Sequence, residues 1–360
     1  MVAPASQPAV SAPVSVKVSI AVPDTDVVLA GTLLLPAGAT EEASVPGVLL
    51  VTGSGPQDRD ETLMGVKPFK VLAEGLVAHG YAVLRYDDRG TQGLGIGQST
   101  GSFAGSTTAD FADDAAAAAS FLAEQPAIDG SRVVVCGHST GGLVTAKLLG
   151  RGEVPAAAVL LAAPSVIGWE LLAYQSNKMV RETDKIQPTG LSDDQLDELD
   201  RVQTAVIKSV AVGTEEEQKE AARGAIAFNV GLAGGDLSEF TPEMMDAAIE
   251  QALAPLRDPW MAYFLSYDPA EDLAAASVPV LAVFGGLDVQ VAPEQNVERM
   301  SAHLRASRHE LSTSITLESQ NHLFQKAETG LIMEYATAGE PMQPLLIDLM
   351  VAWMDRVLED

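Results

Sequence analysis

The stretch that decides the fold spans residues 132–142 and reads Arg132-Val133-Val134-Val135-Cys136-Gly137-His138-Ser139-Thr140-Gly141-Gly142. Its first five residues form an almost continuously apolar run, typical of a strand buried on both faces of a parallel sheet. A helical pattern follows from residue 142, so the Gly-x-Ser-x-Gly segment forms a sharp turn between strand and helix. Glycines flank the serine because larger side chains would clash there. The segment predicts Ser139 as a nucleophile at the carboxyl end of a central strand.

The rest of the chain alternates short apolar runs with helical segments. This alternation predicts a mostly parallel sheet that is covered by helices on both faces. A half-buried hairpin at residues 14–22 and 27–35 comes first, and a helix at 345–358 ends the chain. The predicted buried strands are residues 47–51, 81–86, 132–136, 157–161 and 278–284, and a further strand is predicted at 314–318. The main helices between them are 69–78, 108–123 and 142–149.

One long segment, residues 169–267, interrupts the alternation because it contains no convincing strand. Its helices carry start signals: Ser192–Gln195 and Thr214–Glu217 fit a capping box, and Pro242 follows Thr241 at a first helical turn. We therefore expect a flexible tail (1–13), a core in two parts (14–168 and 268–360) and an inserted helical cap (169–267). The cap is expected to fold back over Ser139, and Trp260 and Met261 are candidate substrate-binding residues in an acyl pocket.

A serine nucleophile needs a base and an acid, and the chain has five histidines. His322 lies in a loop just after the last predicted strand, at the sheet edge where ligands bind in such folds. Asp288 follows the strand 278–284 in the same way, so the chain order is Ser139, Asp288, His322. Two alternatives stay open: His322 as an ordinary loop histidine, and Asp288 as the cap of a turn. Glu294, the nearest other acid, fits a helix start better.

A tetrahedral intermediate also needs donors for its oxyanion. The N–H of Thr140, the residue after the nucleophile, is one candidate. The loop after strand 47–51 provides the second through the N–H of Ser54, with Gly55 as the alternative. Charged residues in this loop (Asp58, Arg59, Asp60) and in the loop after strand 81–86 (Asp87, Asp88, Arg89) predict an ion-pair network between the two loops.

Composition limits the function classes. Acidic residues number 49 against 22 basic ones, a net charge of -27, which disfavours nucleic acids and anionic membranes as partners. The single cysteine, Cys136, permits neither an intramolecular disulfide nor a cysteine metal cluster. No cofactor or metal is predicted, and no apolar run reaches the roughly 18 residues of a membrane span. Residues 1–13 lack the pattern of an export signal, so the expected compartment is either the cytoplasm or, for a mature form, outside it. Oligomeric state is left open.

Three segments, Gly53–Asp60, Leu84–Gly90 and Gly137–Ser139, together resemble the bacterial esterase D (Thermotoga-type) family of carboxylesterases, within the α/β-hydrolase superfamily. The resemblance departs at Thr140, where relatives often carry glutamate, and at an insertion over residues 91–98. It implies an α/β-hydrolase fold and a serine carboxylesterase for short- to medium-chain esters, with a small-molecule ester as partner. A thioesterase or an amide or peptide hydrolase with the same triad is the alternative. A non-catalytic binding protein is disfavoured because every triad position holds a competent residue.

Overall fold

The computed structural model describes residues 12–307 and 309–359 of the chain, so most of the tail predicted at residues 1–13 lies outside the described residues. Eight strands form one sheet in the order β1-β2-β4-β3-β5-β6-β7-β8. Strands β1 (Val14–Ala21) and β2 (Val28–Leu35) form the predicted antiparallel hairpin. From β4 (Ala82–Tyr86) to β8 (Thr313–Leu317) neighbouring strands are parallel. The remaining strands are β3 (Val45–Val51), β5 (Ile128–His138), β6 (Ala157–Leu161) and β7 (Val280–Gly285).

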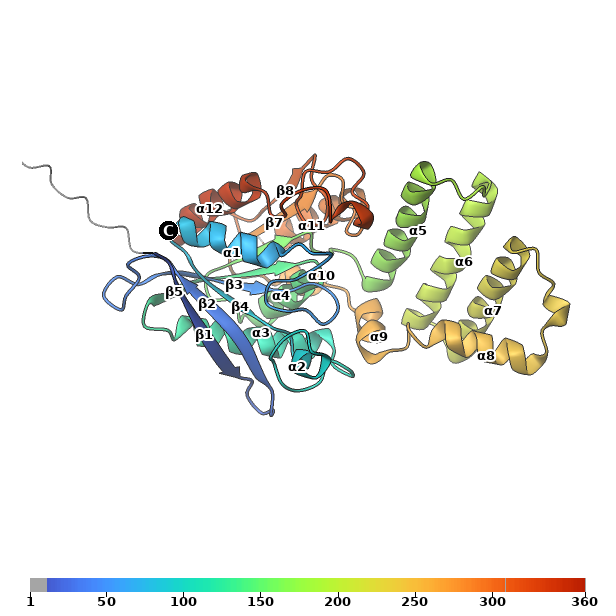
Figure 1. The fold of residues 1–360 in the computed structure, drawn as a ribbon, viewed down its shortest axis with the longest axis horizontal. Helices are drawn as coiled ribbons and strands as arrows, with labels where there is room; N and C mark the ends of the chain where they lie inside the picture. The colour runs from blue at the N-terminus through green and yellow to red at the C-terminus, as the bar shows by residue number, and fades with distance from the viewer. Residues whose placement is uncertain (1–11, 308, 360) are drawn as a thin grey trace, which may run out of the picture.

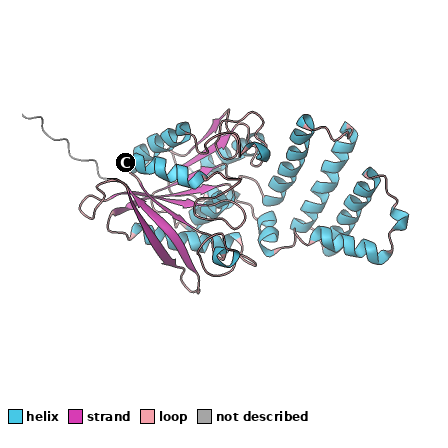
Figure 2. Ribbon diagram, in the orientation of Figure 1, coloured by secondary structure: helices cyan, strands magenta, loops and turns pink. Residues whose placement is uncertain are grey.

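Helices cover both faces of this sheet (Figure 2). On one face, α1 (Pro68–Ala78) and α12 (Pro344–Glu359) pack on β3 to β7 through residues such as Phe69 and Met350. The other face is covered by α3 (Thr108–Ala123), α4 (Thr140–Arg151), α10 (Ala270–Ala274) and α11 (Pro293–Ser307). The strands are apolar on both sides because each side contacts a helix layer. The predicted α/β architecture is therefore confirmed. Three short helices were not predicted: α2 (Thr91–Leu94), η1 (Leu237–Glu239) and η2 (Ile332–Glu334).

The interrupting segment is helical, as expected. It forms α5 (Gly168–Ile186), α6 (Asp193–Val212), α7 (Glu215–Leu232), α8 (Pro242–Leu253) and α9 (Pro259–Ser266). Both predicted capping boxes are present, at Ser192 and Thr214, and Thr241 caps α8. No helix within residues 12–307 and 309–359 is long and apolar enough to cross a membrane.

These helices form a row that extends away from the sheet (Figure 1). Helix α6 packs on α5, α7 on α6 and α8 on α7, so the last two form an outer arm. A small apolar cluster of Val206, Ala222, Ile249 and Leu253 holds that arm together. The expectation that the whole insertion folds back over Ser139 is therefore wrong for α7 and α8. Their apolar side chains pack against one another, and capping signals cannot show on which neighbour a helix packs.

Candidate active site

Ser139 lies between β5 and α4, at the carboxyl end of the central strand. Its φ of 54° places a non-glycine residue in the left-handed region, a conformation found where the backbone must present a side chain. Both flanking glycines are required. A Cβ on Gly141 would overlap the carbonyl oxygens of Val51 and Thr52, and one on Gly137 would overlap that of Gly141. The turn therefore has the geometry that the motif predicted.

His322 and Asp288 form a buried pair in the loops after β8 and β7. The Nδ1 atom of His322 lies 2.7 Å from Oδ2 of Asp288, and the two residues are 4% and 0% exposed. The other oxygen, Oδ1, accepts hydrogen bonds from the N–H groups of Gln290 (2.7 Å) and Val291 (3.0 Å). Burial by itself raises the pKa of Asp288, but the charge and hydrogen bond of His322 and these two N–H groups bring it below its usual value. Asp288 is thus an ionised carboxylate with both oxygens engaged.

Ser139 and His322 line the same cavity, of about 150 Å³. Ser54 from the loop after β3 also lines it, so three of the predicted site residues meet here. Two further wall residues, Gln290 and Tyr335, are linked by a 2.8 Å hydrogen bond from Gln290 Nε2 to the Tyr335 hydroxyl. Tyr335 could not be found from the sequence pattern, because it lies in an irregular segment after η2.

The predicted oxyanion donors have free N–H groups. Among residues 12–307 and 309–359, the amides of Ser54 and Thr140 donate to no acceptor of the protein. Thr140 is the first residue of α4, where an amide has no partner within the helix and the helix dipole favours negative charge. Gly55, the alternative donor, lines a second and smaller cavity, of about 20 Å³, together with Thr140. The amide of Gly53 is already used, since it donates to Oε1 of Glu61 at 2.8 Å.

The two candidate substrate-binding residues differ in position. Trp260 of α9 lines the 20 Å³ cavity and stacks on Phe264 with ring centroids 5.6 Å apart. Met261, one residue on, packs against the main apolar core and lines none of the cavities described here. The prediction of Met261 as a pocket residue is therefore not supported, because successive residues of a helix face different directions.

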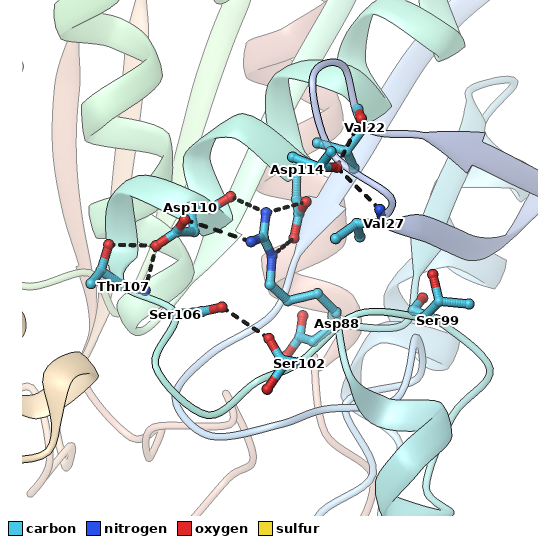
Figure 3. Close-up of polar contacts among 12 residues, drawn as sticks. Val22, Val27, Asp88, Ser99, Ser102, Ser106, Thr107, Asp110 and Asp114 are labelled. Atoms are coloured by element: carbon cyan, nitrogen blue, oxygen red, sulfur yellow. Dashed lines mark hydrogen bonds and ion pairs between the residues drawn. The ribbon is translucent and has the colours of Figure 1, made fainter.

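The predicted ion-pair network is present in part. Arg59 pairs with Asp87 through both oxygens, at 2.8 Å and 2.7 Å, and so joins the two loops. Arg89 instead turns to α3, where its guanidinium pairs with both carboxylate oxygens of Asp114 and lies near Asp110 (Figure 3). Asp60 pairs with Arg85 on the neighbouring strand.

Asp88 has no cationic partner among the residues that the structure describes, contrary to the prediction. Its two oxygens accept hydrogen bonds from the Thr52 hydroxyl (2.7 Å) and the Gln57 N–H (2.9 Å). Burial, together with the negative charges of Asp114 and Glu61, raises the pKa of Asp88 to about 8 in spite of these donors. Asp88 is therefore protonated at neutral pH, and it lines the small cavity beside Thr140.

This arrangement has the organisation of a known family. The model of the alpha/beta hydrolase family matches residues 48–329. The chain belongs to this family. The α/β-hydrolase match begins in β3 and ends beyond His322, so it contains Ser139, Asp288 and the whole helical insertion.

Individual relatives are distant. Esterase EstD of Thermotoga maritima is 27% identical over 328 residues, which cover 91% of this α/β hydrolase and 65% of that protein. The chain thus spans a little less than two thirds of that relative's length. The crystal structure of the α/β hydrolase GrgF from Penicillium sp. sh18 shares the fold with a TM-score of 0.55 at 16% identity, over 96% of this chain and 99% of that one. An esterase of Pyrococcus furiosus aligns with a TM-score of 0.50 at 14% identity, over 96% and 89% of the two chains.

Proposed function

We propose that this protein is a serine carboxylesterase that hydrolyses short- to medium-chain esters through an acyl-enzyme on Ser139. The observation that carries the proposal is the shared cavity: a serine in the left-handed conformation lies in it with a histidine whose Nδ1 is 2.7 Å from a buried carboxylate. The named esterase among its distant relatives supports the same reaction.

In the acylation step, Ser139 Oγ attacks the ester carbonyl carbon while Nε2 of His322 accepts the hydroxyl proton. Asp288 fixes the proton of the imidazole on Nδ1, which leaves Nε2 as the acceptor, and it stabilises the imidazolium that forms. The N–H groups of Ser54 and Thr140 donate to the developing oxyanion. His322 then gives its proton to the leaving alcohol, and the acyl group stays on Ser139.

Deacylation repeats these roles with water. His322 accepts a proton from a water molecule, which attacks the acyl carbonyl carbon, and the same N–H groups stabilise the second oxyanion. Collapse of this intermediate returns the proton to Ser139 and releases the carboxylic acid. Each step uses only groups at the carboxyl edge of the sheet, so the outer helices α7 and α8 take no part in the chemistry.

Cavity size favours small acyl groups. A cavity of about 150 Å³, the volume beside Ser139, holds a group the size of benzene. Its apolar wall is formed by Leu63, Leu323 and Ile332. The second cavity, which Trp260 lines, has room for about one water molecule. We therefore expect the best substrates to carry acyl chains of up to about six carbons.

Thioester and amide hydrolysis use the same triad and are the second candidate. A long thioester such as acyl-coenzyme A offers phosphates, and none of the residues lining the cavity at Ser139 is lysine or arginine. This lining therefore favours an uncharged ester.

The test is a panel of p-nitrophenyl esters from acetate to dodecanoate, with acyl-coenzyme A and peptide substrates alongside. The wild type is expected to prefer short esters, and Ser139→Ala is expected to fold normally and to lose several orders of magnitude in kcat. Mass spectrometry after treatment with an organophosphonate is expected to find the label on Ser139. Labelling of another serine, or activity retained in Ser139→Ala, would contradict the proposal.

A further inference from the structure

A second buried carboxylate–imidazole pair lies beside the proposed triad and takes no part in the mechanism above. Oε1 of Glu61 lies 2.9 Å from Nδ1 of His138, the residue before the nucleophile. Both side chains are almost fully buried, at 4% and 3% exposure. An ion pair this deep costs desolvation free energy, so its presence calls for a reason other than stability.

The pair contacts all three loops that form the site. Oε1 of Glu61 accepts the N–H of Gly53 at 2.8 Å, in the loop that carries Ser54. His138 belongs to the nucleophile turn. Its other nitrogen, Nε2, lies 3.0 Å from the main-chain carbonyl oxygen of His322, and the two imidazole rings are 4.8 Å apart. A chain of contacts thus runs from Gly53 through Glu61 and His138 to His322.

These contacts are compatible with a charged pair. A carbonyl oxygen can only accept, so Nε2 of His138 carries a proton. An ionised Glu61 can also only accept, so Nδ1 carries one as well. Burial alone lowers the pKa of His138, but the charge and hydrogen bond of Glu61 and the carbonyl of His322 raise it above its usual value. The imidazolium–carboxylate form satisfies the contacts of Oε1, Nδ1 and Nε2, while Oε2 of Glu61 has no hydrogen-bond partner among the described residues.

The backbone is strained to place Glu61 there. Its φ is 54°, in the left-handed region that glutamate rarely adopts. The residues around it fix this conformation: Arg59 is tied to Asp87, and the N–H of Glu61 donates to the carbonyl oxygen of Asp58 at 2.9 Å. Strain that the surroundings maintain in this way is found at functional sites.

We propose that Glu61 and His138 are positioning residues. Their ion pair fixes the loop that carries Ser54 and the loop that carries His322 in place relative to Ser139. The inference rests on the proposed esterase function, because it assigns Ser54 and His322 the roles given there. Both residues line the cavity at Ser139, but within the described residues neither forms a hydrogen bond to the side chain of Ser139 or to Nε2 of His322. They act through the amide next to Ser54 and through the main chain of His322.

The test compares Glu61→Gln, His138→Gln and the double variant with the wild type. Beside an uncharged amide at position 61, His138 is expected to be a neutral imidazole with only one N–H. It then cannot donate both to the oxygen at position 61, which also accepts from Gly53, and to the carbonyl oxygen of His322. We expect kcat for the best ester to fall by about tenfold to a hundredfold in each single variant, with KM changed by less than about threefold. The double variant should lose no more than the worse single one, because both break one unit.

A second readout separates positioning from mere stability. A short-chain trifluoromethyl ketone forms a hemiketal with the serine and places an oxyanion between the donors. The affinity of the ketone should fall in parallel with kcat. The value of kcat is calculated per active site, and active sites are counted by organophosphonate labelling. The matched control is Tyr81→Phe, which removes the 2.6 Å hydrogen bond from the buried Tyr81 hydroxyl to Asp355 on α12. That variant should unfold at lower temperature and keep its kcat per labelled site.

The outcomes separate the two proposals. A wild type that is neither active on esters nor labelled at Ser139 removes the proposed function. An active and labelled wild type whose Glu61 and His138 variants keep kcat and ketone affinity within twofold removes only the positioning role. A loss of kcat per labelled site in Tyr81→Phe that equals theirs removes it as well. If Glu61→Gln is insoluble, His138→Gln decides by the same two measurements.

Discussion

Asp288→Asn tests the proposed acid directly, because the structure dictates how an amide would sit at this position. Oδ1 accepts two backbone N–H groups, from Gln290 and Val291. The amide must keep its oxygen there, so its NH₂ group faces Nδ1 of His322, where Oδ2 now lies 2.7 Å away. Nδ1 must then accept, and the proton of the neutral imidazole moves to Nε2. The base would present a proton to Ser139 in place of a lone pair.

The expected loss follows from this wrong tautomer. In a serine protease with the same arrangement the change costs about 10⁴ in kcat, which corresponds to about 5.4 kcal/mol of transition-state free energy. We expect a loss of that order here, with KM little changed because no group that contacts the substrate is removed. Asparagine has nearly the same shape and volume as aspartate, so the variant should fold.

The assay is steady-state hydrolysis of a short p-nitrophenyl ester by Asp288→Asn beside Glu294→Gln. Glu294 is the nearest other acid in sequence, but it pairs with Lys178 and accepts from the Tyr174 hydroxyl on α5. Its variant should therefore keep wild-type kcat. Turnover within about tenfold of wild type in Asp288→Asn, or an equal loss in Glu294→Gln, would refute the assignment of the acid.

Three further predictions concern Asp88, Gly141 and Trp260. Asp88 holds its proton up to about pH 8 when folded but loses it near 3.8 when unfolded, so the folded state binds the extra proton between these values and stability falls as pH rises. The expected change is about 1.4 kcal/mol per pH unit. In urea titrations, the free energy of unfolding should therefore fall between pH 5 and pH 7 by about 3 kcal/mol more in wild type than in Asp88→Asn. Equal changes in the two proteins would contradict the raised pKa. Gly141→Ala should destabilise by at least about 2 kcal/mol in the same titration, because its methyl group overlaps main-chain oxygens that cannot move aside; an unchanged midpoint would count against the rigid turn. Trp260→Ala should shift the kcat/KM optimum to longer acyl chains by opening the small cavity, whereas Met261→Ala, changed in the core, should leave the optimum in place; the same shift in both would argue against Trp260 as the wall.

The sheet, its helices and the positions of Ser139, Asp288 and His322 could be predicted because local pattern determines them. Continuous apolar runs identify buried strands, and the carboxyl ends of parallel strands lie at one edge whatever the loops do. The left-handed backbone of Ser139 also follows from two glycines that leave no room for a Cβ. Each of these inferences needs information from only a few neighbouring residues.

The pairing of Glu61 with His138 and the packing of the outer helices could not be predicted in this way. Glu61 and His138 are 77 residues apart, and neither segment indicates the other as a partner. Nothing local shows that a glutamate in a charged loop turns inward at positive φ. The helices α7 and α8 have apolar faces that suit any partner, and the choice between the core and one another depends on loop geometry that periodicity does not encode.

Two buried carboxyl groups at this sheet edge, Asp288 and Asp88, have pKa values that are shifted in opposite directions. Both shifts suit the proposed chemistry. Asp288 is held ionised beside His322, where an imidazolium must form. Asp88 is held protonated beside Thr140, where an oxyanion must form and a second negative charge would oppose it. The difference arises from partners, because both side chains are buried while only Asp288 contacts a group that can become a cation. A chain with 49 acidic residues can therefore hold a buried carboxyl group neutral in the cavity that Thr140 lines.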